Sequence, residues 1–133
     1  NAPLARNKTD RKLISVCRDD EGKHAVTHYT VLERYPKVQG MSMPLTLVKC
    51  RLETGRTHQI RAHFASIGHP LLGDGKYGTN KLNKDFGYRK QCLYSYKLVF
   101  MFDESAGILS YLHSREFEVK DVWFKREFEN GTL

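Results

Sequence analysis

The 133-residue sequence predicts an α+β fold with a mainly antiparallel sheet, one central helix and a second helix near the C-terminus. Two adjacent segments carry most of this prediction. Residues 45–53 alternate between two faces, as a half-buried strand does. Directly after them, Ile60, Phe64 and Ile67 fall on one stripe at helical spacing. Other segments rich in Val, Thr and Tyr favour further strands.

The first half of the chain predicts two strands before residues 45–53. Residues 1–10 are polar, have no usable period and are predicted to form a loop. Residues 11–17 alternate loosely and suit a strand, and residues 25–35 have the composition of a long strand. Two prolines and a glycine interrupt residues 36–44. The segments on either side of this break should therefore pair as an antiparallel hairpin.

A helix is predicted immediately after Gly55. Thr57 can cap its start, because a threonine hydroxyl accepts a hydrogen bond from a free N–H of the first turn. Gly68 followed by Pro70 is a normal stop signal. Arg61 directly follows Ile60 of the apolar stripe, so it lies about 100° around the helix from that residue. We therefore expect its guanidinium at the rim of the core, beside a cleft.

The second half is less regular. Residues 71–89 predict a long loop, and loops of this length in compact domains are often functional. Residues 93–102 alternate as a strand that could pair with residues 108–112. Residues 118–129 suit a C-terminal helix covering the sheet. The length allows one domain, so residues 1–133 are taken as a single domain.

Composition indicates a globular protein of the cytoplasm. Apolar residues make up 40% and charged residues 28% of the chain, and no apolar run approaches the roughly 20 residues of a membrane span. The three cysteines lie far apart, each in an apolar, strand-like run. This spacing favours buried, reduced thiols over a disulfide framework or a metal cluster.

The net charge of +7 comes from one part of the chain. Residues 49–97 hold ten Lys or Arg side chains and three acidic ones, whereas the remaining residues balance. A local positive field is what a polyanion-binding face requires. Charge alone therefore favours a nucleic acid partner over a solvated basic surface.

Several familiar motifs can be set aside. Residues 73–78 match G-x-G-x-x-G, but they follow a predicted helix and not a strand, so they are no dinucleotide fingerprint. His58, His63 and His69 are spaced by five and six residues, which does not suit the i, i+4 face of a zinc helix. No nucleophile elbow is present. We expect no metal and no hydrolase triad.

Two arginines of the central segment call for different partners. Arg56, in the turn, suits an RNA phosphate near the positive end of the helix. Arg61, at the edge of the core, suits a fixed carboxylate, because a desolvated guanidinium needs a bidentate acceptor. From the residues alone, a surface salt bridge for Arg56 and a buried structural pair for Arg61 are equally good interpretations.

A family resemblance favours the functional interpretation. Residues 54–63 (TGRTHQIRAH), then Gly68-His69-Pro70, Leu72-Gly73-Asp74 and Tyr77-Gly78, resemble the signature of the RluA-type RNA pseudouridine synthases. Weaker similarity extends over most of the chain. The resemblance implies part of a pseudouridine synthase catalytic domain. It also implies isomerisation of specific uridines in rRNA or tRNA, with no metal or organic cofactor.

The resemblance assigns roles to individual residues. The second arginine of the signature, Arg61, would pair with the essential catalytic aspartate of the family. Leu93 matches a position that lines the uracil pocket. The remaining expected RNA-binding residues come from the two motifs: Arg56, Thr57, His58, Gln59, His63, Lys76 and Tyr77.

The chain departs from the family in one important respect. The family's aspartate lies in a His-Arg-Leu-Asp motif upstream of the signature, and the 133 residues contain no such motif. Asp74 belongs to the Leu-Gly-Asp turn and does not replace it. We therefore expect a C-terminal portion of such an enzyme that is inactive alone, with a non-catalytic RNA-binding module as the alternative. Such a portion would expose a sheet edge and favour self-association.

Overall fold

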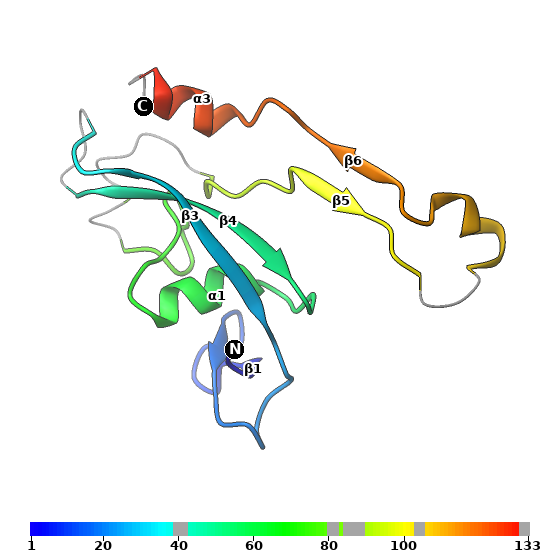
Figure 1. Cartoon of the computed structure of the whole chain (residues 1–133). Coiled ribbons are helices and arrows are strands. Elements are labelled where there is room, and N and C mark those ends of the chain that lie inside the picture. Colours follow the sequence, from blue (N-terminus) through cyan, green and yellow to red (C-terminus); the bar gives the residue numbers. More distant parts are fainter. Residues whose placement is uncertain (39–42, 80–82, 84–89, 103–105, 131–133) are drawn as a thin grey trace.

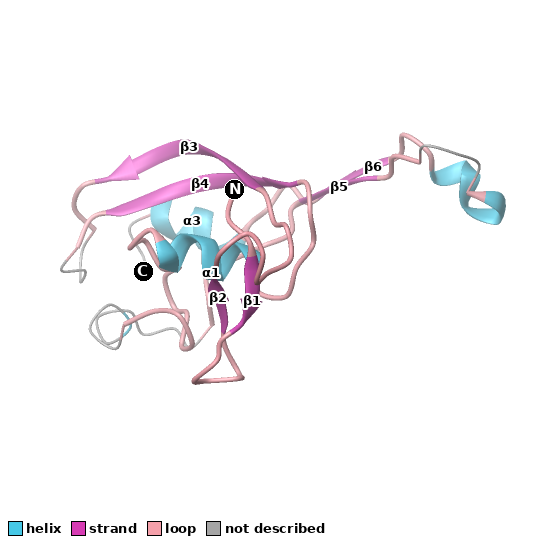
Figure 2. Cartoon of the chain, turned by 90° about the horizontal axis from the view of Figure 1, so that it is seen from below, coloured by secondary structure: helices cyan, strands magenta, loops and turns pink. Residues whose placement is uncertain are grey.

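The computed structural model describes all residues except 39–42, 80–82, 84–89, 103–105 and 131–133 (Figure 1). In the part that it describes, the strands pair as three separate two-stranded antiparallel sheets, β1–β2, β3–β4 and β5–β6. Helix α1 (Gln59–Ser66) lies between the long β3–β4 hairpin and the small β1–β2 sheet (Figure 2). The predicted α+β class is confirmed, although one continuous sheet is replaced by three small ones.

The β3–β4 hairpin is the longest regular element. Strand β3 (Thr27–Tyr35) pairs with β4 (Leu45–Leu52) from Thr27 opposite Leu52 to Tyr35 opposite Leu45. A bulge between Val31 and Glu33 interrupts the register, as an extra residue in one strand does. The predicted antiparallel hairpin is confirmed. Its β4 end leads directly into the turn before α1.

The N-terminal residues form a strand that was not expected. Strand β1 (Leu4–Arg6) pairs with β2 (Ile14–Val16), with Leu4 opposite Val16. Leu4 is buried and forms the core with Ala25 and Ala62 of α1. The prediction of a loop for residues 1–10 was wrong for Leu4–Arg6. Leu4 is the one large apolar side chain in this polar segment, and one such residue gives no periodic pattern.

Helix α1 ends as predicted. Gly68 has a φ of +79°, the Gly68 N–H donates to Ala65 O, and the His69 N–H donates to Phe64 O. This pair of bonds is the Schellman motif, which uses a glycine in the left-handed region. The predicted apolar stripe is only partly correct. Phe64 is buried against the edge of Tyr29, with ring centroids 5.4 Å apart, but Ile67 is exposed.

An arm extends from the rest of the molecule in both views (Figures 1 and 2). It consists of β5 (Lys97–Val99), the 3₁₀ helix η1 (Gly107–Leu112) and β6 (Glu116–Glu118), with β5 and β6 antiparallel. The predicted pairing of residues 93–102 with residues 108–112 was wrong, because the latter coil into η1 and the returning strand lies beyond them.

The C-terminal helix α3 (Trp123–Glu129) begins later than predicted, because Glu116–Glu118 belongs to the arm. Phe124 of this helix is buried, and Phe128 stacks on Tyr35 at the end of β3, with ring centroids 5.6 Å apart. Helix α3 thus packs at one end of the hairpin. None of the described helices is both long enough and apolar enough to cross a membrane.

Candidate functional site

The turn between β4 and α1 has an unusual backbone. His58 occupies the N-cap position with φ 52° and ψ 23°, the left-handed region that histidine rarely adopts. No side chain caps the helix. The predicted capping role of Thr57 is therefore wrong, because the left-handed residue delays the helix to Gln59. Thr57 itself is exposed.

Gln59 anchors this turn to β3. Its Oε1 accepts from the Arg56 N–H at 3.0 Å and from the Thr54 hydroxyl at 2.8 Å. Its Nε2 donates to Val26 O at 2.9 Å and to Thr27 Oγ1 at 3.0 Å. The side chain is 3% exposed. The expectation that Gln59 contacts RNA is corrected, because its amide is buried and its oxygen and nitrogen already form hydrogen bonds within the protein. These bonds give the side chain a structural role.

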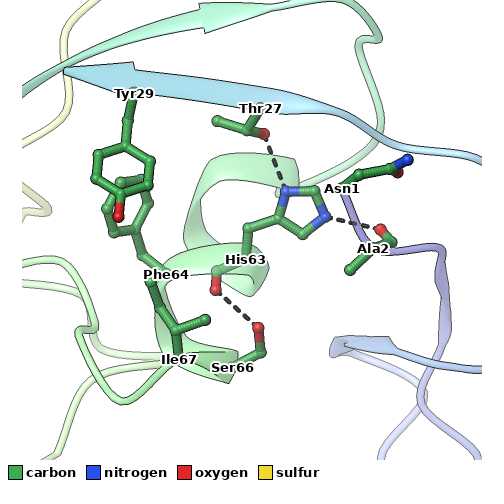
Figure 3. A pocket seen from close by; sticks show the side chains of 8 residues that line it. All are labelled: Asn1, Ala2, Thr27, Tyr29, His63, Phe64, Ser66 and Ile67. Atoms are coloured by element: carbon green, nitrogen blue, oxygen red, sulfur yellow. Dashed lines mark hydrogen bonds between the residues drawn. The ribbon is translucent and has the colours of Figure 1, made fainter.

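His63 is also a structural residue (Figure 3). Its Nε2 lies 2.8 Å from Ala2 O and its Nδ1 lies 2.9 Å from Thr27 Oγ1. A carbonyl only accepts, so Nε2 carries the proton and Nδ1 accepts from the Thr27 hydroxyl. Neither ring nitrogen is left for RNA, which corrects that expectation for His63. The ring instead ties α1 to β3 and to the N-terminal segment.

A pocket of about 160 Å³ lies beside this ring, and Figure 3 shows the side chains that line it. It is lined by Asn1, Ala2, Thr27, Tyr29, His63, Phe64, Ser66 and Ile67. Arg61 is not among them, so this pocket is separate from the candidate chemistry.

The chemistry-bearing group is Arg61, on the neighbouring face of α1. Its Nε donates to Asp74 Oδ2 at 2.8 Å and its Nη2 donates to Asp74 Oδ1 at 2.7 Å. The Arg61 side chain is 12% exposed and that of Asp74 is fully buried. Within the chain, Arg61 thus has one carboxylate partner, Asp74, thirteen residues further on. This pair is the structural one that the residues alone left open, and the pairing of Arg61 with the family's catalytic aspartate stays a prediction.

Asp74 is ionised in this setting. Burial would raise the pKa of its carboxyl, but the bonds from Arg61 and from the backbone N–H groups of Lys76 and Tyr77 outweigh burial, so the pKa lies below its ordinary value. In turn, the hydrogen bond to Asp74 raises the pKa of Arg61. The pair is thus charged throughout the physiological range.

Tyr77 completes what we call the Arg61 cluster: His58, Arg61, Asp74 and Tyr77. The Arg61 guanidinium carbon lies 5.1 Å from the centre of the Tyr77 ring, a cation–π distance. The Tyr77 hydroxyl oxygen accepts from the Ile14 N–H at 2.9 Å and lies 3.0 Å from His58 Nδ1. Two residues expected at the RNA, His58 and Tyr77, are thus in direct contact with each other.

His58 is neutral in this cluster. Burial lowers the pKa of its imidazole, and the positive charges of Arg61 and Lys76 lower it further. Since the Tyr77 oxygen already accepts from Ile14, its own proton can be directed at His58 Nδ1. The Nε2 nitrogen then carries the imidazole proton and offers a donor.

The other predicted residues lie around the cluster. Arg56 and Lys76 are exposed, and the Arg56 Nε donates to His24 O at 3.1 Å. Leu93 is 38% exposed. It follows Cys92, whose N–H donates to Leu72 O at 2.8 Å. Leu93 therefore lies next to the loop that carries Asp74.

Sequence reasoning missed Asp74 as a member of the site. One signal was available: Asp74 stands between two glycines, and an aspartate in such a turn can bind the backbone N–H groups that follow it, as Asp74 does with Lys76 and Tyr77. Gly73 before it has a φ of +74°, and a side chain there would collide with the backbone of Lys90. This close approach seats the Asp74 loop against the segment that leads to Leu93.

Comparisons with known proteins support the family resemblance of the sequence. Residues 1–66 match the family model described as RNA pseudouridylate synthase. The chain is 44% identical over 115 residues to the uncharacterized RNA pseudouridine synthase YlyB of Bacillus subtilis, covering 86% of this chain and 30% of that protein. It is 41% identical over 106 residues to ribosomal large subunit pseudouridine synthase D of Zymomonas mobilis, covering 76% of this chain and 31% of that protein.

A solved structure is also similar. The human RNA pseudouridylate synthase domain containing 1 protein matches with a TM-score of 0.56 and 27% identity, over 68% of this chain and 38% of that chain. The chain thus spans less than a third of the length of the two bacterial relatives. Signature, structure and relatives agree on one assignment: this chain belongs to the RNA pseudouridylate synthase family.

Proposed function

We propose that this chain supplies the arginine side of an active site that converts uridine in RNA to pseudouridine. One observation carries the proposal: the Arg61 guanidinium is nearly buried, yet Asp74 bonds it only through Nε and Nη2. A guanidinium has five N–H donors, so three are left after the bonds to Asp74, one on Nη2 and two on Nη1. The edge that joins these two nitrogens, here called the Nη1 edge, faces away from Nε. That edge can bind a second carboxylate.

A second carboxylate is required, because Asp74 does not suit the reaction. Four N–H groups surround its two oxygens, from Arg61 Nε and Nη2 and from the backbone of Lys76 and Tyr77. A carboxylate so enclosed and fully buried cannot approach a ribose or a base. The other described aspartates are Asp10, Asp19, Asp20 and Asp121, all of them exposed. The sequence also holds no His-Arg-Leu-Asp motif, so we propose that the reacting aspartate belongs to another part of the full natural protein.

The role of Arg61 follows from its charge. A guanidinium bound to a carboxylate favours the ionised form and fixes its orientation, so the acid is ready to act on the nucleotide at neutral pH. The uridine must leave the base stack before a protein group can reach it. Isomerisation then breaks the N1–C1′ bond and forms a C5–C1′ bond, while C5 loses its proton to solvent and N1 gains one.

The surface around the cluster suits RNA. Arg56 and Lys76 are exposed cations on either side of the α1 start, within the segment that carries the entire net positive charge. Phosphate contacts of this kind position a nucleic acid without reading its sequence. The proposed partner is RNA, of the ribosomal or transfer class, and the reaction needs no metal or organic cofactor.

A tritium-release assay with RNA labelled at uridine C5 tests the proposal. We expect release by the full natural protein, and RNA binding without release by the 133-residue chain alone. Release by this chain alone would overturn the proposal that the reacting aspartate lies elsewhere. If the full natural protein binds RNA but releases no tritium from any RNA class, the chain belongs to a non-catalytic RNA-binding module. The internal carboxylate partner of Arg61 favours that second candidate.

A further inference from the structure

Asp74 is a fully buried, charged group to which the proposed reaction assigns no step. Burying an ion is costly unless it is paired and hydrogen-bonded. Within the described residues, the fully buried side-chain oxygen and nitrogen atoms all have partners, those of Asp74 included. The question is what this costly arrangement does for Arg61.

The bonds to Asp74 define the plane of the guanidinium. Two roughly parallel N–H···O bonds, of 2.8 Å from Nε and 2.7 Å from Nη2, hold one edge of the fork in a single orientation. Asp74 cannot turn with the guanidinium, because Oδ1 also accepts from the Lys76 N–H at 2.9 Å and the Tyr77 N–H at 3.1 Å. The acceptor is thereby fixed to the backbone.

Tyr77 supports the face of the same group. Its ring lies 5.1 Å from the guanidinium carbon, and its hydroxyl is held by the Ile14 N–H of β2. The ring is therefore anchored to a different element from the helix that carries Arg61. Among the described residues, the bonds to Asp74 occupy one edge of the guanidinium and the Tyr77 ring one face, and no hydrogen bond is made at the Nη1 edge.

We propose that Asp74 and Tyr77 are positioning residues, which hold the Nε–Nη2 edge and one face of Arg61 so that its Nη1 edge meets the reacting carboxylate. This inference rests on the proposed function. It differs from a purely structural pair, which would stabilise the loop without affecting the reaction. It also differs from an inhibitory pair, in which Asp74 would compete with the reacting carboxylate for Arg61.

The test uses tritium release by the full natural protein, with kcat and the KM for RNA measured separately. Asp74→Asn keeps the shape but removes the charge and replaces one acceptor by a donor. We expect kcat to fall about tenfold or more with KM changed less than about twofold, because a group that acts only on the reacting carboxylate changes the chemical step. Asp121→Asn is the matched control, since Asp121 forms an exposed pair with Arg126.

A second pair of variants covers the case in which Asp74→Asn fails to fold. Tyr77→Phe and Tyr77→Leu both lose the hydroxyl bonds, but only Phe keeps a ring under Arg61. We expect Tyr77→Leu to have a kcat several-fold below that of Tyr77→Phe at similar KM. Thermal unfolding and RNA binding of each variant identify those that fold.

The outcomes separate the two proposals. No release by the unsubstituted protein would refute the proposed function itself. Release by that protein, with a folded Asp74→Asn variant at full or raised kcat, would refute only the positioning role, and a raised kcat would indicate inhibition by Asp74. Equal kcat values for Tyr77→Phe and Tyr77→Leu would refute the part assigned to the ring.

Discussion

Arg61 and Asp74 are joined by two hydrogen bonds, at Nε and Nη2, in surroundings that leave Asp74 no contact with solvent. The pair connects the middle of α1 to a loop whose own backbone N–H groups bind the same carboxylate. Removal of either partner therefore affects both stability and the proposed chemistry. Experiments on Arg61 must separate these two effects.

Arg61→Met should destabilise the protein by about 3–5 kcal/mol, because it leaves a buried carboxylate without its counter-charge. The double variant Arg61→Met with Asp74→Asn removes both charges and should recover a large part of this loss. It should nevertheless show no tritium release in the full natural protein, while RNA affinity stays within a few-fold. Urea denaturation and the release assay measure the two quantities. Near-normal turnover by the double variant would remove Arg61 from the mechanism.

Arg56→Ala should weaken RNA binding without a large loss of stability. The Arg56 backbone N–H that Gln59 binds is retained, and only the exposed guanidinium is lost. Loss of one phosphate contact should lower the slope of log K against log salt by about 1. Arg18→Ala, an exposed arginine outside the basic segment, is the control. An equal slope for the Arg56 and Arg18 variants would contradict a phosphate contact at Arg56.

Much of this fold follows from local patterns, whereas the site depends on a longer connection. Strict alternation located β4, and a glycine at the helix end produced the expected Schellman motif at Gly68. The start of α1 was not predicted, because His58 adopts a left-handed backbone conformation that only a small fraction of non-glycine residues adopt. Arg61 was predicted to need a carboxylate, but the loop geometry that brings Asp74 to it has no period in the sequence.

The same distinction explains the misassigned polar residues. Gln59 and His63 stand in a motif rich in side chains that often bind RNA. Composition alone cannot distinguish an exposed polar side chain from a buried one. Their positions became clear only from the contacts with Val26 and Thr27, over thirty residues earlier in the chain. The hydrogen bonds of Gln59 and His63, next to the Arg61 cluster, thus help to fix the turn between β4 and α1.

Gln59→Ala tests that correction. Truncation leaves the Arg56 N–H and the Thr54 hydroxyl without their acceptor, at a residue that is 3% exposed, whereas Val26 O keeps the Glu53 N–H. Each unsatisfied buried group costs about 1–3 kcal/mol, so we expect a loss of about 2–4 kcal/mol in the free energy of unfolding. RNA affinity of the folded fraction should change little. Unchanged stability together with a large loss of RNA affinity would show that Gln59 contacts RNA directly.

His58 should make stability depend on pH near neutrality. Burial, followed by the charges of Arg61 and Lys76, lowers the pKa of its imidazole below the ordinary value of about 6.5. As the pH falls through that ordinary value, the unfolded chain binds a proton that the folded chain does not. Stability from this group is therefore complete above about pH 6.5 and declines below it, until the folded pKa is passed.

Denaturation at pH 7.5 and 5.5 measures the difference. His58→Asn is the matched variant, because asparagine tolerates the left-handed backbone and does not titrate. We expect this variant to lose less stability at pH 5.5 than the unsubstituted protein does. Identical losses in the two proteins would show that His58 does not cause the pH dependence.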